Sequence, residues 1–185
     1  MDDGELVERV RNGDQAAFGV LVERHQTAVY RATLAALGSP PDAEEAAQDA
    51  FLAAHRHLHR FRGDSAFRTW LLAIAWRQAL SLRRRRVWRV GRQSEPLPLS
   101  AASGTTPEED LQGIRLRTDL RRLVRALPRR LRDPLLLMGT GEYSYAEVAQ
   151  MLRAPEGTIK SRVFDARRML KERLASLGYE VKLKR

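Results

Sequence analysis

The chain has 185 residues, of which 43% are hydrophobic and 30% charged, and no apolar run approaches the roughly 18 residues that span a bilayer. It has no cysteine, which excludes disulfides, thiolate zinc sites and a thiol sensor within the chain. The formal net charge is +10, but residues 1–60 carry ten acidic and six basic side chains, so the 27 basic and 13 acidic side chains of the remainder give it a net charge of +14. Such a surplus favours a polyanion such as DNA, because Arg and Lys neutralise phosphates. A merely solubilising surface is the alternative.

The N-terminal part of the chain shows a helical pattern of apolar residues. Leu6, Val7 and Val10 indicate a short helix that stops near Gly13. Asp14 is suited to cap a second, longer helix, because its carboxylate can accept a hydrogen bond from a free backbone N–H group.

Two interruptions divide the helices that follow. Residues 38–41, Gly-Ser-Pro-Pro, form a break, and Asp42 with Glu45 has the spacing of a capping box for a third helix. Residues 62–65, Arg-Gly-Asp-Ser, interrupt the pattern again. A fourth helix then runs into the four consecutive arginines at 83–86, a run that repels itself without a partner.

Gly, Pro, Ser and Ala dominate residues 91–106, and the apolar periodicity is lost there. A structureless stretch of this length is unusual inside a compact domain, so it predicts a flexible linker. Thr106 and Pro107 are typical of the start of the next helix. We therefore expect an all-α fold of two small helical domains, residues 1–90 and 107–178, followed by a basic tail at 179–185.

The second domain carries the pattern of a helix-turn-helix. Ser144 and Glu147 form a capping box for a short helix, and a tight turn at 153–157 precedes a basic helix that counts Phe164 among its apolar residues. In this motif the start of the second helix reaches base edges, while flanking residues hold phosphates. The candidate DNA-binding residues of this helix are Glu156, Gly157, Thr158, Lys160, Ser161, Arg162, Arg167 and Arg168. A basic amphipathic helix on a protein surface is the alternative.

No residue set suits catalysis, a metal or a cofactor. His55, His57 and His59 are two residues apart, and such side chains point about 200° away from one another on a helix, so they cannot converge on one ion. The sequence also lacks a Ser/His/Asp grouping, a Gly-rich phosphate loop and a paired-carboxylate motif. We therefore expect neither an enzyme nor a cofactor.

Several segments together resemble one known family. Residues 42–52 and 61–71 closely resemble the region 2 domain of extracytoplasmic-function (group 4) sigma factors of bacterial RNA polymerase. Residues 127–152, 155–162 and 166–170 resemble their region 4 domain. The resemblance covers almost the whole chain, and it implies a factor that binds core RNA polymerase, including its flap, and directs promoter-specific initiation while the polymerase supplies all the catalysis.

The resemblance also implies roles for individual residues. One helix would face the clamp helices of the polymerase largest subunit through Gln48, Asp49, Phe51 and Leu52. A loop and the helix after it would capture the melted −10 element of promoter DNA through Phe61, Arg62, Gly63, Asp64, Ser65, Phe67, Arg77, Arg83 and Arg84. The helix-turn-helix residues named above would read the −35 element in duplex DNA.

The family further implies an inhibitory partner and a compartment. Such factors are commonly held inactive by an anti-sigma protein, and we expect such a partner here. We expect the chain itself in the cytoplasm, without membrane insertion. The anti-sigma protein could tether the chain to the membrane. Four residues depart from the family pattern. Arg77 and Ser81 stand where Asn and Asp are frequent, Arg153 stands in the turn where Gly is frequent, and Pro134 could tilt or shorten a helix.

Three other interpretations remain open at the level of the sequence. A stand-alone helix-turn-helix regulator explains the second domain but leaves residues 61–70, the arginine run and the linker without a role. A protein-interaction module fits the acidic first 60 residues but not the basic remainder. An enzyme acting on nucleic acid lacks a catalytic set.

Overall fold

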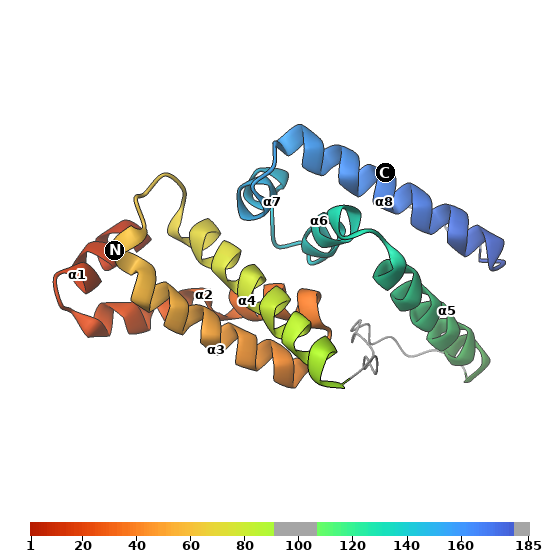
Figure 1. The fold of residues 1–185 in the computed structure, drawn as a ribbon, viewed down its shortest axis with the longest axis horizontal. Coiled ribbons are helices and arrows are strands. Elements are labelled where there is room, and N and C mark those ends of the chain that lie inside the picture. The colour runs from red at the N-terminus through yellow and green to blue at the C-terminus, as the bar shows by residue number, and fades with distance from the viewer. Residues whose placement is uncertain (91–106, 180–185) are drawn as a thin grey trace.

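The computed structural model of the chain describes residues 1–90 and 107–179. Within these two ranges every regular element is a helix and there is no strand, so the all-α prediction is confirmed (Figure 1). The predicted linker, the cap at Thr106 and most of the predicted basic tail lie outside the described residues. None of the described helices is both long and apolar enough to cross a membrane.

The first group of helices forms a bundle. It comprises α1 (Asp3–Arg11), α2 (Gln15–Leu37), α3 (Pro40–His57), the short 3-10 helix η1 (Leu58–Arg60) and α4 (Phe67–Val90). Helices α2, α3 and α4 all pack against one another. Small side chains on one face of α3 allow this close packing, because four of them are fully buried alanines: Ala43, Ala46, Ala50 and Ala54.

The second group comprises α5 (Pro107–Ala126), α6 (Arg129–Gly139), α7 (Tyr145–Leu152) and α8 (Glu156–Ser176). Helix α8 contacts the other three, and α5 extends from the far end of the group (Figure 1). Pro134 is buried inside α6, which continues to Gly139, so the proline does not shorten this helix.

The capping predictions succeed at two positions and fail at one. Asp14 caps α2 by accepting from the Ala17 N–H, and both halves of the Ser144–Glu147 capping box are present. The prediction for Asp42 is wrong. Helix α3 begins at Pro40, whose missing N–H needs no cap, and the carboxylate of Asp42 instead pairs with Arg86 Nη1 at 2.5 Å.

The two groups contact each other directly. Helix α4 packs against α7, and α2 packs against α6. One continuous buried apolar cluster includes Ile74 and Trp76 of α4 as well as Val148 and Met151 of α7. In the described parts of the chain, the two groups of helices therefore pack against each other and share one apolar core.

Candidate nucleic-acid interface

The turn between α7 and α8 has the geometry of a helix-turn-helix. Helix α7 ends at Arg153, which lies in the left-handed region at φ 52° and ψ 51° and is the only non-glycine residue with positive φ among the described residues. The backbone N–H of Arg153 donates to the carbonyls of Ala149 and Gln150, which closes α7. Pro155 then has extended backbone and precedes the first turn of α8. Arg153 thus occupies the conformation that glycine adopts at least cost.

Helix α8 has a buried face and an outward face. The buried face consists of apolar residues at helical spacing: Ile159, Val163, Ala166, Leu170 and Leu174. The outward face combines small, basic and aromatic side chains, all exposed: Gly157, Lys160, Ser161, Phe164, Arg167 and Arg168. Glu156 is exposed at the start of the helix, and Thr158 and Arg162 are half-buried at the edges of the outward face. The structure therefore brings the predicted −35 residues together at one end and one side of α8.

Phe164 is a further candidate residue of this interface, and the sequence reasoning missed it. The apolar pattern placed it with the buried residues, but 68% of its surface is exposed. It follows Lys160 by four residues and precedes Arg167 by three, so it shares their face of the helix. This spacing was the one feature of the sequence that could have indicated that Phe164 faces outward. An exposed aromatic ring on a recognition helix can contact the methyl group of thymine.

Ion pairs hold some of these side chains within α8. Lys160 Nζ lies 2.7 Å from Glu156 Oε1 and 5.7 Å from the centroid of the Tyr145 ring. The hydrogen bond to Glu156 raises the pKa of Lys160 above its usual value, so this residue stays charged at neutral pH. Within the described residues, Arg162 and Arg167 have no ion-pair partner. Their guanidinium groups are available to phosphates or guanine.

The loop before α4 divides into a buried base and an exposed tip. Phe61 and Phe67 are buried, and their rings pack edge to face with centroids 5.7 Å apart. Arg62, Gly63 and Asp64 are exposed, whereas Ser65 is half-buried. The two phenylalanines, predicted as part of a DNA-capturing surface, are therefore core residues that anchor the loop rather than residues on its surface.

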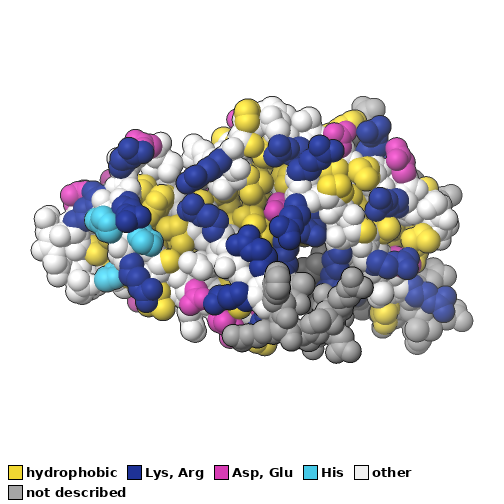
Figure 2. Space-filling view, viewed as in Figure 1, with side chains coloured by type: hydrophobic (Ala, Val, Ile, Leu, Met, Phe, Trp, Pro, Cys, Tyr) yellow, Lys and Arg dark blue, Asp and Glu magenta, His cyan; other side chains and the backbone are white. Residues whose placement is uncertain are grey.

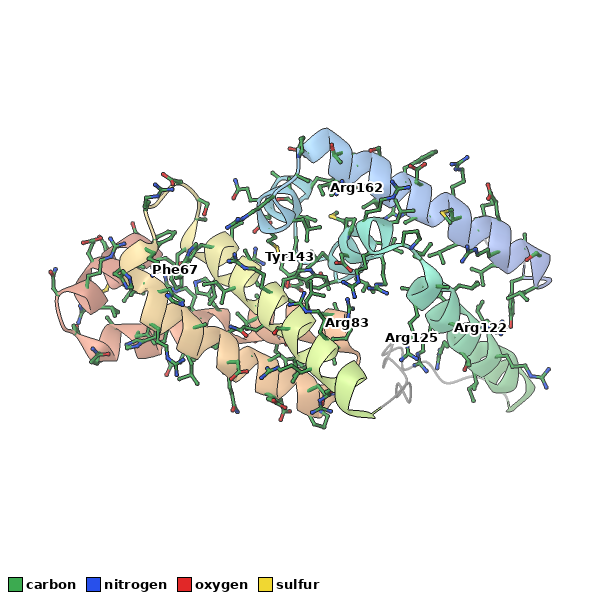
Figure 3. The ribbon with its side chains drawn as sticks, in the orientation of Figure 1. Phe67, Arg83, Arg122, Arg125, Tyr143 and Arg162 are labelled. Atoms are coloured by element: carbon green, nitrogen blue, oxygen red, sulfur yellow. The ribbon has the colours of Figure 1, made fainter. Side chains whose placement is uncertain are left out.

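The basic residues of α4 lie beside basic residues of the second group (Figures 2 and 3). Arg77 and Arg84 are exposed, but Arg83 is half-buried and donates to the carbonyl of Ala36 at 3.2 Å. Burial lowers the pKa of Arg83 to about 10, and the nearby Arg132 contributes further. Burial, with a contribution from Arg153, also lowers the pKa of Arg77. Both groups remain charged at neutral pH, so cations from the two groups of helices are crowded together here.

The outer surface of α3 carries the residues predicted to face polymerase. Gln48 is exposed, and Leu52 exposes 55% of its surface. Asp49 is half-buried, with one carboxylate oxygen 3.8 Å from Arg85 Nη2. Phe51 is half-buried and packs against the apolar core. Of the four residues predicted to face polymerase, Gln48 and Leu52 are thus the exposed ones, and Asp49 and Phe51 are half-buried.

Metal-binding geometry is absent from the described residues. No group of three or more His, Cys, Asp or Glu side chains in those ranges could hold an ion. His55 is hydrogen-bonded to Gln15, and the rings of His57 and His59 lie 6.4 Å apart.

Two family models match the chain, one in each group of helices. The Sigma-70 region 2 model matches residues 21–89, and the Sigma-70, region 4 model matches residues 117–170. The first match covers α3, the 61–66 loop and most of α4, and the second covers the helix-turn-helix. The prediction of two helical domains is thereby confirmed.

Relatives of known type are similar over nearly the full chain. The ECF RNA polymerase sigma-E factor of Escherichia coli is 34% identical, with 96% of both chains covered, and the RNA polymerase sigma-H factor of Pseudomonas aeruginosa is 30% identical, with 95% of both covered. Among solved structures, CnrH in complex with the cytosolic domain of CnrY is 25% identical with a TM-score of 0.65, covering 94% of this chain and 97% of that one. The sigma factor RpoE of Bartonella quintana, in complex with the anti-sigma factor NepR, is also 25% identical, with a TM-score of 0.63 over 85% of this chain and 96% of that one.

Proposed function

Because the chain belongs to the extracytoplasmic-function family of sigma factors of bacterial RNA polymerase, we propose that it directs initiation at its own promoters by reading duplex −35 DNA and capturing the melted −10 strand. Sigma factors are initiation factors and not enzymes, so the chain has no catalytic role of its own. The working units of this proposal are residues 1–90 for polymerase and the −10 element, and residues 107–178 for the −35 element.

The observation that carries the proposal is the outward face of α8. It offers exposed basic side chains at the end of a helix-turn-helix that enters the major groove in proteins of this type. Lys160, Arg167 and Arg168 would hold phosphates, while Ser161 and Phe164 would meet base edges. The N-terminus of α8 adds a positive dipole end that favours a backbone phosphate.

Capture of the −10 strand is assigned to the exposed loop tip and to α4. A melted strand needs a pocket for an unstacked base and a basic track for its backbone, which together offset the few kcal/mol that base unpairing costs. The exposed tip at residues 62–64 and the half-buried Ser65 would contact the base, while Arg77, Arg83 and Arg84 would follow the phosphates. Phe61 and Phe67 would support the loop from below.

Two protein partners complete the proposal. The exposed Leu52, with Gln48 and Asp49 beside it, would dock on the polymerase clamp helices, and the second domain would dock on the flap. An anti-sigma protein would bind the factor and hold it inactive; the similar sigma factor of Bartonella quintana was crystallised with such a partner, NepR. These partners place the chain in the bacterial cytoplasm, with any membrane tethering supplied by the anti-sigma protein.

Reconstitution tests the proposal. The purified chain is mixed with bacterial core RNA polymerase and assayed for co-elution and for initiation on a pool of genomic fragments. We expect co-elution and starts on a restricted set of fragments, whose alignment gives the two promoter elements. A chain that binds DNA but ignores core polymerase would instead be a stand-alone helix-turn-helix regulator.

A substitution then separates the two DNA contacts. Arg162→Ala should weaken binding to −35 duplex DNA about tenfold, because a guanidinium contact to a base or phosphate contributes on the order of 1–3 kcal/mol. Co-elution with core polymerase should not change, because Arg162 lies on α8 in the surface assigned to DNA and not in the α3 surface assigned to the clamp helices. Loss of polymerase binding in this variant would contradict the division of roles.

A further inference from the structure

One acidic side chain interrupts the basic outward face of α8. Asp165 follows Ser161 by four residues and precedes Arg168 by three, so it lies on the same side of the helix as these two exposed residues. Its side chain exposes 46% of its surface. Helix α8 runs along the upper edge of the molecule in Figure 1, and its buried residues, Val163 and Ala166 among them, lie on a different side. A carboxylate is therefore presented on the surface assigned to −35 DNA.

The contacts of Asp165 within the chain are weak. Among the described residues its ion-pair partner is Arg168, with 3.4 Å between Oδ1 and Nη2, which is longer than a typical hydrogen bond. Exposed pairs three residues apart on a helix contribute little to stability. Glu156, at the start of the same helix, is held more closely, with its Oε1 2.7 Å from Lys160 Nζ. The carboxylate of Asp165 therefore keeps the capacity to accept a hydrogen bond from a ligand.

A carboxylate at this place needs a specific partner on DNA, because it repels the phosphates that the surrounding cations attract. The major groove presents two amino groups that can donate to a carboxylate, N4 of cytosine and N6 of adenine. Adenine also presents its N7 acceptor beside the amino group, and this atom repels a carboxylate. Cytosine itself presents only the donor. The chemistry of Asp165 therefore favours cytosine.

We propose that Asp165 is a specificity-determining residue of the −35 interface, and that its carboxylate accepts a hydrogen bond from the N4 amino group of one cytosine in the major groove. This inference rests on the proposed function, because it names a base that the same surface reads. The neighbouring Arg168 offsets part of the repulsion between the carboxylate and the DNA backbone.

Isosteric replacement tests the assignment by changing the base that is selected. The amide of asparagine both donates and accepts, which matches N7 and N6 of adenine. Full-length wild type, Asp165→Asn and Asp165→Ala are each combined with core polymerase and used to select promoter fragments in which only the −35 element is randomised. We expect one position at which wild type prefers cytosine about tenfold, Asp165→Asn prefers adenine and Asp165→Ala has no preference, with the other positions unchanged.

A purely electrostatic role predicts a different result. If Asp165 only repels phosphates, both substitutions strengthen binding to all sequences alike and make the dependence of affinity on salt steeper by about one counterion. Glu172→Gln is the matched control, because Glu172 is an exposed acidic residue of the same helix that lies seven positions further from its N-terminal end. This variant should leave the base preference unchanged at every position.

The outcomes separate this inference from the proposed function. Identical base preferences in wild type, Asp165→Asn and Asp165→Ala would overturn the role of Asp165, while sequence-selective binding would keep the −35 assignment. A wild-type preference for a base other than cytosine at the affected position would overturn it too. If no form of the chain prefers any −35 sequence in the presence of core polymerase, the proposed function is wrong as well.

Discussion

At the scale of single residues, Arg153 carries an identifiable backbone strain. A residue with a Cβ atom in the left-handed region costs on the order of 1 kcal/mol more than glycine there. Arg153→Gly should therefore raise the free energy of unfolding by about 1 kcal/mol, less a few tenths for the greater freedom of glycine in the unfolded chain. For a chain of this length that corresponds to a rise in Tm of about 2–4 °C, measured by thermal circular dichroism.

The control for this prediction is Arg153→Ala. Alanine keeps the Cβ atom and the strain but removes the charge that lies near Arg77. A gain in Tm confined to the glycine variant assigns the effect to the backbone. An equal gain in both variants would assign it to repulsion between Arg153 and Arg77, and the backbone would then carry no strain worth relieving.

At the scale of elements, α8 has two consecutive apolar residues that lie on different faces of the helix. Val163 is buried and Phe164 is largely exposed. Val163→Ala should lower the free energy of unfolding by about 2 kcal/mol through lost packing. Phe164→Ala should change stability little but weaken binding to −35 duplex DNA about fivefold, since a lost apolar contact is worth about 1 kcal/mol. Thermal melting and fluorescence anisotropy with labelled DNA measure the two effects.

The result that would contradict this interpretation of α8 is a destabilised Phe164→Ala variant with unchanged DNA affinity. In that case the aromatic ring supports the fold, and the DNA-facing surface of α8 is narrower than the exposed residues indicate.

Local signals predicted most of the elements and part of the site. Asp14 and the Ser144–Glu147 box were readable because their hydrogen bonds span only three residues. Two failures have physical reasons. Asp42 has the spacing of a cap, but the prolines before it start the helix without one and its carboxylate pairs with Arg86, 44 positions along the chain. Phe164 has the chemistry of a core residue, and only its position on the helix shows that it faces outward.

At the scale of the whole molecule, the sequence predicted two domains but not their contact. The hydrogen bond from Tyr143 to Ala28 joins residues 115 positions apart, and the pairs from Arg31 and Arg68 to the second domain also join residues far apart in the chain. Periodicity and capping report on neighbours within a helix, so they hold no information about such pairs. The arginines and glutamates involved were readable only as solvated surface residues.

The titration of Tyr143 reports whether this contact persists in solution. Burial raises the pKa of Tyr143 to about 12, because its deprotonation would place an anion in a buried site and remove the proton donated to Ala28. Because the pKa is raised above the ordinary value near 10, neutral Tyr143 contributes stability to this contact that is fully present below pH 10 and is lost as pH rises from 10 to 12. The contact between the two groups of helices should therefore be unaffected by this group near neutral pH and weaken between pH 10 and pH 12.

The measurement is the near-ultraviolet phenolate absorbance of wild type minus that of Tyr143→Phe, which isolates one phenol. We expect a midpoint near 12 in the wild-type chain and a midpoint shifted toward 10 when Arg31→Glu is introduced into both members of the pair, because the opened domains expose the ring to water. A wild-type difference curve with its midpoint near 10 would mean that Tyr143 is already solvated, and that the two domains are apart in the free chain.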